Sequence, residues 1–288
     1  MRKPSSATAI PAVLLSMISV QSGASIAKRL FPVLGASGTS TLRIGLSAIL
    51  LFLVNKPKLF SLTKQQWMYS ISYGLFLGGM NLLFYCGIER IPLGLGVTVE
   101  FVGPLTLALV SSRKLQDLLW ALLACMGILL IVPWNNNGID PIGLLFTLSA
   151  GACWAAYIVM GGKISKIMNN GDAVSIGMCV ATLFILPFGI FSGELAHVTW
   201  VYFIMRLGVA IFSSSIPFTL DFIGLKYLPA KTFSILMSLH PVFAALFGLL
   251  FLSEFLEINQ WISILCIVTA SIGSTLSAHK YSKHHKVA

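Results

Sequence analysis

The chain has 288 residues, 57% of them hydrophobic before its 25 glycines are counted and only 10% charged, whereas soluble domains are about 45–50% apolar with glycine included. Too little polar material remains to cover the core of a soluble protein, so the composition indicates an integral membrane protein. The net charge of +10 does not indicate a nucleic-acid partner, because Lys and Arg lie in short segments between apolar runs rather than on one face among stacking aromatics.

The first apolar run resembles a secretory signal peptide. Two basic residues precede an apolar stretch from Ala9 to Val20, and small residues follow it. The run continues to about Lys28, however, and it has a counterpart in the second half of the chain. We therefore predict that it stays in the protein as the first membrane-spanning helix, with cleavage as the alternative.

Nine further apolar runs follow, separated by charged or turn-rich breaks. A helix needs about 20 apolar residues to cross the hydrocarbon core of a bilayer, and each run is near that length. The predicted fold class is therefore an all-α integral membrane protein with ten transmembrane helices. These lie near residues 8–28, 38–55, 67–88, 92–112, 116–134, 141–161, 173–191, 203–225, 229–252 and 258–277.

The basic residues set the predicted orientation, because Lys and Arg accumulate on the cytoplasmic side of a membrane. With both termini in the cytoplasm, fourteen of the 19 Lys and Arg residues fall in inner segments, and Lys28, Arg29 and Arg90 fall outside. Arg43 and Arg206 lie within predicted helices. This asymmetry requires an even number of spans, and it predicts a multi-pass protein with both termini cytoplasmic.

The second half of the chain repeats features of the first. A Gly-Ala-Ser triplet starts at Gly23 in the first predicted helix, and a Gly-Ala-Cys triplet starts at Gly151 in the sixth. A pair of prolines twelve residues apart occurs in the fourth predicted helix and again in the ninth. These prolines are Pro92 and Pro104 in the first half and Pro229 and Pro241 in the second.

Each half holds five predicted spans, and an odd number makes the second half enter the membrane the opposite way round. Two inverted five-helix repeats are typical of secondary transporters, whose substrate site lies near the bilayer midplane between the repeats. We predict a first repeat at 8–134, a second repeat at 141–277 and a basic cytoplasmic tail at 278–288.

Glu100 is the sharpest candidate for a functional residue, because a charged group within a membrane costs about 2.5–3.5 kcal/mol on insertion scales. It stands four residues before Pro104, and a proline within a helix frees a backbone carbonyl that needs a cavity or a neighbour. We predict that Glu100 contacts a substrate amine or carries a proton. The alternative is a carboxyl group that only ties helices together.

Three more ionisable side chains lie within predicted helices. His240 immediately precedes Pro241 and is a candidate for proton coupling, with a satisfied structural histidine as the alternative. Arg43 is a candidate substrate contact and Asp221 a candidate proton-coupling group. For both, the alternative is a side chain that snorkels to the membrane surface.

Polar and aromatic residues extend the predicted substrate cavity. Asn81 and Tyr85 stand one turn apart in the predicted helix at 67–88, and Trp154 and Tyr157 lie in that at 141–161. Ser213 to Ser215 precede Pro217. The alternative for each aromatic is an anchor at the membrane interface, and for each polar residue a bridge between helices.

The motifs of other functional classes are missing. Gly162-Lys163 would need Gly at Tyr157 and Ser or Thr at Ile164 to form a nucleotide-binding loop. No nucleophile stands beside a base, and the five scattered cysteines lack zinc or disulfide spacing. We predict no enzyme activity, no metal and no cofactor. A purely structural membrane scaffold is disfavoured by the ionisable groups within the helices.

Five sequence blocks resemble the EamA branch of the drug/metabolite transporter superfamily, and within it the threonine/homoserine exporters of bacterial inner membranes. The resemblance covers nearly the whole chain. The blocks are QSGASIAKRLFP at 21–32, GGMNLLFY at 78–85, VEFVGPL at 99–105, GACWAAYI at 151–158 and LPAKTFSILMS at 228–238.

The resemblance implies a central cavity lined by the first four helices of each half, with the helices at 116–134 and 258–277 peripheral. It also implies a location in the bacterial inner (plasma) membrane and efflux of small amino acids across it. This chain departs from the family at His240, where those exporters carry an acidic residue before the proline. The departure leaves the substrate and any proton coupling open.

We therefore expect a secondary transporter that exports threonine- or homoserine-like metabolites by alternating access. The alternative is a transporter of another small metabolite or of an amphipathic drug. Its expected partners are a small-molecule substrate and the lipid bilayer, with protons and a second copy of the chain left open. The expected substrate contacts are Arg43, Asn81, Tyr85, Glu100, Trp154 and Tyr157, and the expected proton-coupling residues are Glu100, Asp221 and His240.

Overall fold

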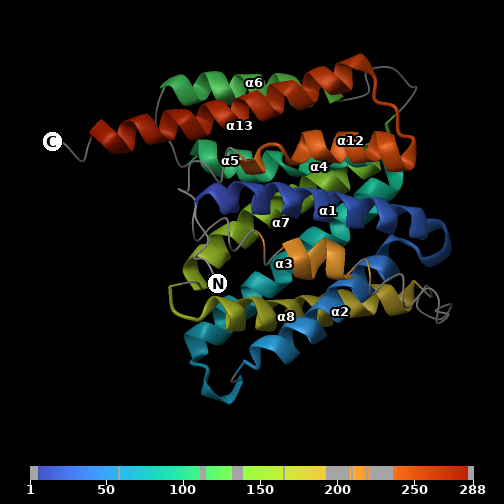
Figure 1. Cartoon of the computed structure of the whole chain (residues 1–288), viewed down its shortest axis with the longest axis vertical. Coiled ribbons are helices and arrows are strands. Elements are labelled where there is room, and N and C mark those ends of the chain that lie inside the picture. The colour runs from blue at the N-terminus through green and yellow to red at the C-terminus, as the bar shows by residue number, and fades with distance from the viewer. Residues whose placement is uncertain are drawn as a thin grey trace.

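The computed structural model describes residues 6–57, 59–110, 115–131, 139–164, 166–192, 208, 210–217, 220 and 236–284. Every regular element in these ranges is a helix, so the all-α prediction is confirmed (Figure 1). The α-helices are α1 (Ser6–Leu34), α2 (Ala36–Asn55), α3 (Lys64–Arg90), α4 (Leu93–Glu100), α5 (Val102–Val110), α6 (Leu115–Ile131), α7 (Pro141–Ile164), α8 (Asn170–Phe191), α12 (His240–Leu252) and α13 (Ile258–His284). A short 3₁₀ turn, η1 (Leu59–Ser61), and a π-helix, η3 (Ile211–Ser215), complete the described elements.

Five of these helices, α1, α2, α3, α7 and α8, are long and apolar enough to cross a membrane. Shorter apolar helices occur at Leu93–Leu107, His240–Leu252 and Ile258–Gly273. The described residues therefore form a multi-pass membrane protein. Most of the predicted span at 203–225 lies outside the described residues, and Asp221 lies there too.

Local sequence signals explain where the long helices end. Gly35 adopts φ 57° between α1 and α2, in the left-handed region that glycine enters without a side-chain clash. Its amide donates to the Phe31 carbonyl at 2.8 Å, which closes α1. Thr63 and Gln66 form a reciprocal capping box that starts α3.

Contacts between helix ends show that the chain passes back and forth across the molecule. At one end, called here the Lys28 end, Lys28 pairs with Glu254 and Arg90 pairs with Asp140. There α1, α3 and α12 finish, while α4 and α7 begin. At the opposite end, called the Asn55 end, Asn55 of α2 donates to Ser175 of α8. The long axes of these helices therefore span the same two surfaces.

Two helix pairs form opposite edges of the molecule. α6 and α13 lie side by side along one edge, and α2 and α8 lie along the other (Figure 1). Glycines allow close approach within each pair, with Gly127 of α6 against Ile267 and Gly45 of α2 against Thr182. The remaining described helices lie between the two edges.

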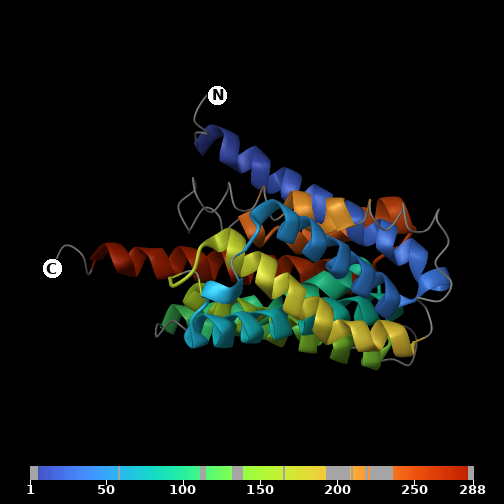
Figure 2. The same cartoon turned by 90° about the horizontal axis from the view of Figure 1, so that it is seen from below.

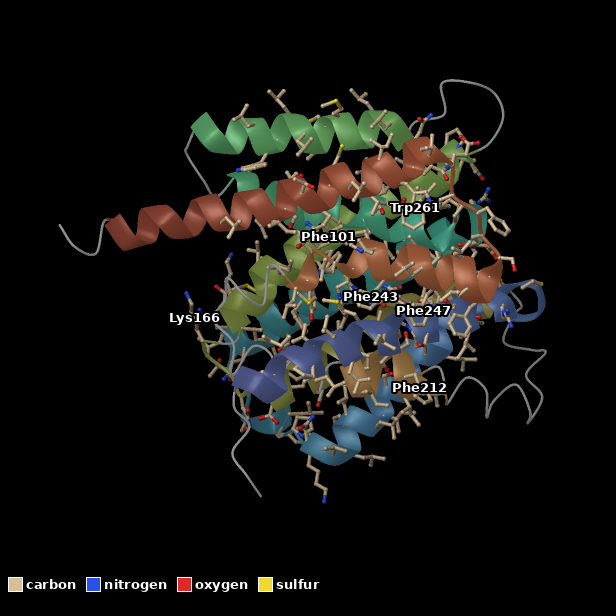
Figure 3. The ribbon with its side chains drawn as sticks, turned by 45° about the horizontal axis from the view of Figure 1, so that its top comes forward. Phe101, Lys166, Phe212, Phe243, Phe247 and Trp261 are labelled. Atoms are coloured by element: carbon tan, nitrogen blue, oxygen red, sulfur yellow. The ribbon has the colours of Figure 1, made fainter. Side chains whose placement is uncertain are left out.

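The predicted helix at 92–112 has a one-residue irregularity at Phe101, although the apolar segment stays helical from Leu93 to Leu107. α4 stops at Glu100 and α5 starts at Val102, with Phe101 at the break (Figure 3). Pro104 has no amide hydrogen, so it cannot bond to the carbonyl of Glu100, four residues earlier. That carbonyl instead faces Gly151 of α7, where the missing side chain makes room.

Two other predicted segments show further detail. Within the predicted span at 229–252, Leu236 and Met237 are helical, a turn at Ser238 and Leu239 follows, and α12 starts at His240, because Pro241 has no amide hydrogen for the preceding turn. Residues 229–235 of this predicted span lie outside the described residues. The predicted tail at 278–288 is helical as far as His284, and the last turns of α13 project beyond the neighbouring helices (Figure 2).

Candidate functional site

Arg43 of α2 is the centre of a buried polar network. Its side chain is 8% exposed, and one terminal nitrogen donates to the Ser213 hydroxyl at 2.7 Å. The other terminal nitrogen donates to the side-chain oxygen of Asn81. The guanidinium also lies 4.9 Å from the ring centre of Tyr85, in a cation–π contact. One cation thus connects α2, α3 and η3.

Local structure holds the partners of Arg43 in place. The Asn81 amide donates to the Leu77 carbonyl at 2.7 Å, which fixes its oxygen toward Arg43. Ser213 lies in the π-helix η3, an irregular helix type that occurs often at functional sites. Gly23 of α1 abuts Ser213, since a side chain at Gly23 would stand 2.6 Å from the Ser213 Cβ. α1 therefore closes the network on a third side.

Glu100 lies near this network without pairing with its cation. It is the last residue of α4 and is 8% exposed. Its carboxyl group is within electrostatic range of Arg43. Among the described residues, Arg43 and Glu100 form no ion pair with each other, and the Glu100 side chain accepts no hydrogen bond. The carboxyl group therefore has bonding capacity left for a ligand.

His240 lies at the start of α12 and contacts α1. Its Nδ1 is 3.3 Å from the side-chain nitrogen of Gln21, and both residues are buried. Which ring nitrogen carries the proton depends on the tautomer. The other ring nitrogen, Nε2, has no hydrogen-bond partner among the described residues.

An apolar cluster places the site residues of four helices at one level. Ala24 of α1, Tyr85 of α3, Val97 of α4 and Ala244 of α12 belong to this cluster. α1, α3 and α12 run toward the Lys28 end, and α4 runs away from it. In each of the four helices, the residue one turn closer to the Asn55 end than the cluster residue is polar. In the same order, these are Gln21, Asn81, Glu100 and His240.

Several buried polar atoms around this level lack hydrogen-bond partners within the described ranges. Buried polar groups are nearly always hydrogen-bonded in folded proteins, and unpaired ones are costly in a membrane. A group of unpaired atoms between helices therefore indicates a place where a polar ligand or water binds. The atoms are Gln21 Oε1, the Ser25 hydroxyl, Arg43 Nε, the Tyr85 hydroxyl, the Ser214 hydroxyl and His240 Nε2.

The structure brings four of the predicted substrate contacts together. The other two, Trp154 and Tyr157, each pack against an aromatic ring. Arg43, Asn81, Tyr85 and Glu100 gather at the polar level described above. Trp154 packs edge-on against Phe101 at 5.8 Å, and Tyr157 stacks on Tyr73 at 4.7 Å. The Tyr157 and Tyr73 hydroxyls are 3.0 Å apart. The roles assigned to all these residues stay predictions, as does that of Asp221, which lies outside the described residues.

Sequence reasoning did not single out Gln21, which the structure buries against His240, or Ser25, which is buried next to Ala24 of the apolar cluster. Their signal was present, because they are polar residues four apart on one face of an apolar helix. The chain offers no cluster of three or more His, Cys, Asp or Glu residues for a metal within its described part. The arrangement is suited to binding a small molecule with both a positive and a negative charge.

Comparison with known proteins gives consistent results. The model of the EamA-like transporter family matches residues 141–276. The threonine/homoserine exporter RhtA of Escherichia coli strain K12 is 41% identical over 274 residues, which are 94% of this chain and 92% of that protein. The threonine/homoserine exporter RhtA of Salmonella typhimurium strain SL1344 is 40% identical over 271 residues, 93% of this chain and 91% of that protein.

A solved crystal structure of a more distant protein also resembles this one. The two share 17% sequence identity, and the superposition has a TM-score of 0.60. It covers 96% of this chain and 99% of the other. A likeness at this identity shows a shared fold.

Proposed function

Because this chain belongs to the EamA-like transporter family, we propose that it exports threonine, homoserine and closely related small amino acids across the inner membrane of a bacterium. Family membership makes the chain a membrane transporter and not an enzyme, as its sequence predicted. The substrate is proposed from the exporters that are 40% and 41% identical to it over 93% and 94% of its length.

A buried cation and a buried carboxyl group that do not pair with each other carry the amino-acid proposal. Arg43 and Glu100 are each 8% exposed and lie within electrostatic range. An unpaired charge within a membrane is costly, so each group benefits from a ligand of opposite charge. A free amino acid carries a carboxylate and an ammonium group on one carbon. We assign its carboxylate to Arg43 and its ammonium group to Glu100.

We also propose that ten helices form two inverted repeats, 8–134 and 141–277. Several observed helix pairs support this, because exchanging both helices of the pair for those five places along the predicted order gives another pair in contact. α3 packs on α7, and the exchanged pair of η3 and α1 is in contact too. Likewise α4 packs on α7, and α12 packs on α1.

The proposed transport cycle is alternating access, in which the Lys28 end faces the outside of the cell. Charge balance supports this orientation, since Lys28, Arg29 and Arg90 are the predicted outer basic residues. Between the site and this end stand the apolar cluster and the Lys28–Glu254 ion pair, at 2.6 Å. Lys28 also donates to the Ile91 carbonyl at 2.6 Å. Outward release would require these contacts to separate.

Glu100 is our proposed proton-coupling residue, because protonation would remove the charge that holds the substrate ammonium group. The coupling roles of His240 and Asp221 stay predictions, and so does a homodimer. A proton-coupled exporter would bind substrate when Glu100 is ionised and release it when Glu100 is protonated.

Counterflow in liposomes tests the proposed function. Purified protein would be reconstituted, and entry of labelled threonine and homoserine measured with and without a pH gradient. Glu100→Gln should lower counterflow at least about tenfold, since a hydrogen bond to a charged group contributes about 1.5–3 kcal/mol. Glu257→Gln is the matched control, because Glu257 is exposed between α12 and α13.

Two results would contradict the proposal. Absence of counterflow by the unaltered protein for both amino acids would favour the alternative, a carrier of another metabolite or an amphipathic drug, which a broad competition screen would identify. Unchanged transport by Glu100→Gln would remove Glu100 from the substrate and proton site.

A further inference from the structure

One turn of α1 contacts both the Arg43 network and His240. Gly23 abuts Ser213, which accepts a hydrogen bond from Arg43. Ala24 belongs to the apolar cluster that includes Tyr85. Gln21, in the same turn, contacts His240. A ligand held between Arg43 and Glu100 would therefore lie beside this turn.

The part of α1 from Gln21 to Ser25 has hydrogen-bonding atoms that lack partners among the described residues. Gln21 is 1% exposed and uses only one end of its amide, whichever way the amide is oriented. Ser25 is also 1% exposed, and its hydroxyl lacks a partner among the described residues. By contrast, the hydroxyl of Ser22 donates to the Ile18 carbonyl at 2.6 Å. Gln21 and Ser25 thus keep free capacity that an ordinary helix serine does not.

The chemistry of the proposed substrates matches this capacity. Threonine and homoserine are both hydroxylated forms of 2-aminobutyrate, with the hydroxyl on the third carbon in threonine and on the fourth in homoserine. A transporter that accepts both needs hydrogen-bonding groups for either hydroxyl position. Gln21 and Ser25 are four residues apart on one helix face, which separates their Cβ atoms by about 5–6 Å.

We propose that Gln21, Ser25 and His240 form a subsite that recognises the side-chain hydroxyl of the substrate. This inference rests on the proposed function, because it assumes that Arg43 and Glu100 hold the amino-acid backbone. Gln21 is oriented by His240 and offers its free amide end. Ser25 and His240 Nε2 provide the second and third contacts. The subsite would reject an amino acid of the same size that lacks the hydroxyl, since these buried groups would stay unpaired.

The test compares three labelled substrates in the same liposomes: threonine, homoserine and 2-aminobutyrate. We expect the unaltered protein to transport both hydroxylated amino acids at least about tenfold better than 2-aminobutyrate, because a site built to bind a hydroxyl discriminates strongly against its absence. In Gln21→Met this preference should fall at least about tenfold, with 2-aminobutyrate transport kept. Ser25→Ala should change the ratio of threonine to homoserine.

Ser22→Ala is the matched control, since Ser22 lies in the same turn and bonds to its own helix. It should leave all three rates unchanged. A ratio of rates does not depend on the amount of folded protein, and Ser25→Ala provides a second variant that adds no bulk. Thermal unfolding of each variant in detergent would be measured alongside.

The possible outcomes separate the subsite from the proposed function. If the unaltered protein transports neither threonine nor homoserine, the proposed function fails and the subsite fails with it. If it transports both but does not prefer them to 2-aminobutyrate, only the subsite is overturned. The subsite is also overturned if Gln21→Met keeps the preference for hydroxylated amino acids. It is likewise overturned if Gln21→Met lowers all three rates equally, since Gln21 would then be a structural residue.

Discussion

Glycine brings backbones together on both sides of the α4–α5 segment, but only one side adds polar contacts. On the α7 side, Gly103 of α5 and Gly151 of α7 meet beside the Glu100 carbonyl. On the other side, Gly94 of α4 lies against the Ala245 backbone of α12, while polar side chains join α1 to α12 and an ion pair closes the Lys28 end. Backbone packing through glycine does not adapt to movement, whereas hydrogen bonds and ion pairs break and re-form. The polar contact between α1 and α12 is therefore the one suited to opening.

The ion pairs at the Lys28 end differ in the same way. The side chains of Lys28 and Glu254 are 16% and 15% exposed, and Glu254 also accepts from the Leu93 amide at 2.6 Å. On the α7 side, the side chains of Arg90 and Asp140 are 43% and 31% exposed. A shielded pair that joins α1, the start of α4 and the segment after α12 stabilises closure more than a solvated pair does.

The largest effect is expected on the α7 side, where Gly151→Leu would force a side chain into the Glu100 carbonyl. Overpacking of this kind costs about 3 kcal/mol at the upper end of its usual range. The melting temperature in detergent and the yield of monodisperse protein should both fall. Gly162→Leu on the same helix is the control, because a Cβ there meets nothing within 4 Å. Equal stability of the two variants would refute rigid packing at this contact.

The next effect is expected from Glu254→Gln, which leaves Lys28 without its counter-ion. Loss of a charged hydrogen-bond partner at a shielded site costs about 2 kcal/mol. A double-mutant cycle with Lys28→Met would measure the coupling through thermal unfolding. Additive effects of the two substitutions would mean that the pair does not stabilise closure. Faster counterflow in Glu254→Gln would further link the pair to opening.

A smaller effect is expected from Tyr157→Phe, which removes the hydroxyl contact between α7 and α3. One neutral hydrogen bond contributes about 1 kcal/mol, and the ring stack on Tyr73 would remain. Stability should fall slightly while the apparent affinity for threonine stays the same. A large loss of substrate affinity would instead support the predicted role of Tyr157 as a substrate contact.

The smallest effect is expected from Asp140→Asn, and it should depend on pH. The hydrogen bond from Arg90 lowers the pKa of Asp140 below its ordinary value of 3.8. A carboxyl group with a lowered pKa stabilises the folded state above its ordinary pKa, and this contribution is lost as the pH falls through the lowered value. The melting temperatures of the two proteins should differ at neutral pH and converge in strong acid. A difference that grows toward acid would contradict this sign.

Much of the site could be predicted, because buried charge within an apolar helix is visible in the sequence. Glu100 and Arg43 are conspicuous for this reason, and Pro104 draws attention to the Glu100 carbonyl, which lies against Gly151. Gln21 was not predicted as a site residue. An uncharged amide in a helix has many ordinary roles, and only its contact with His240, 219 residues away, distinguishes it.

The sequence by itself determined that this protein is helical, lies in a membrane and carries charge within its helices, because each property depends on composition and on distances along one segment. Only the tertiary structure decided which side chains meet at one level. That outcome depends on the direction of each helix and on which glycines permit close approach, and it also placed Trp154 against Phe101 and Tyr157 against Tyr73. Contacts between distant segments are set by the packing of the whole bundle, and no single segment contains that information.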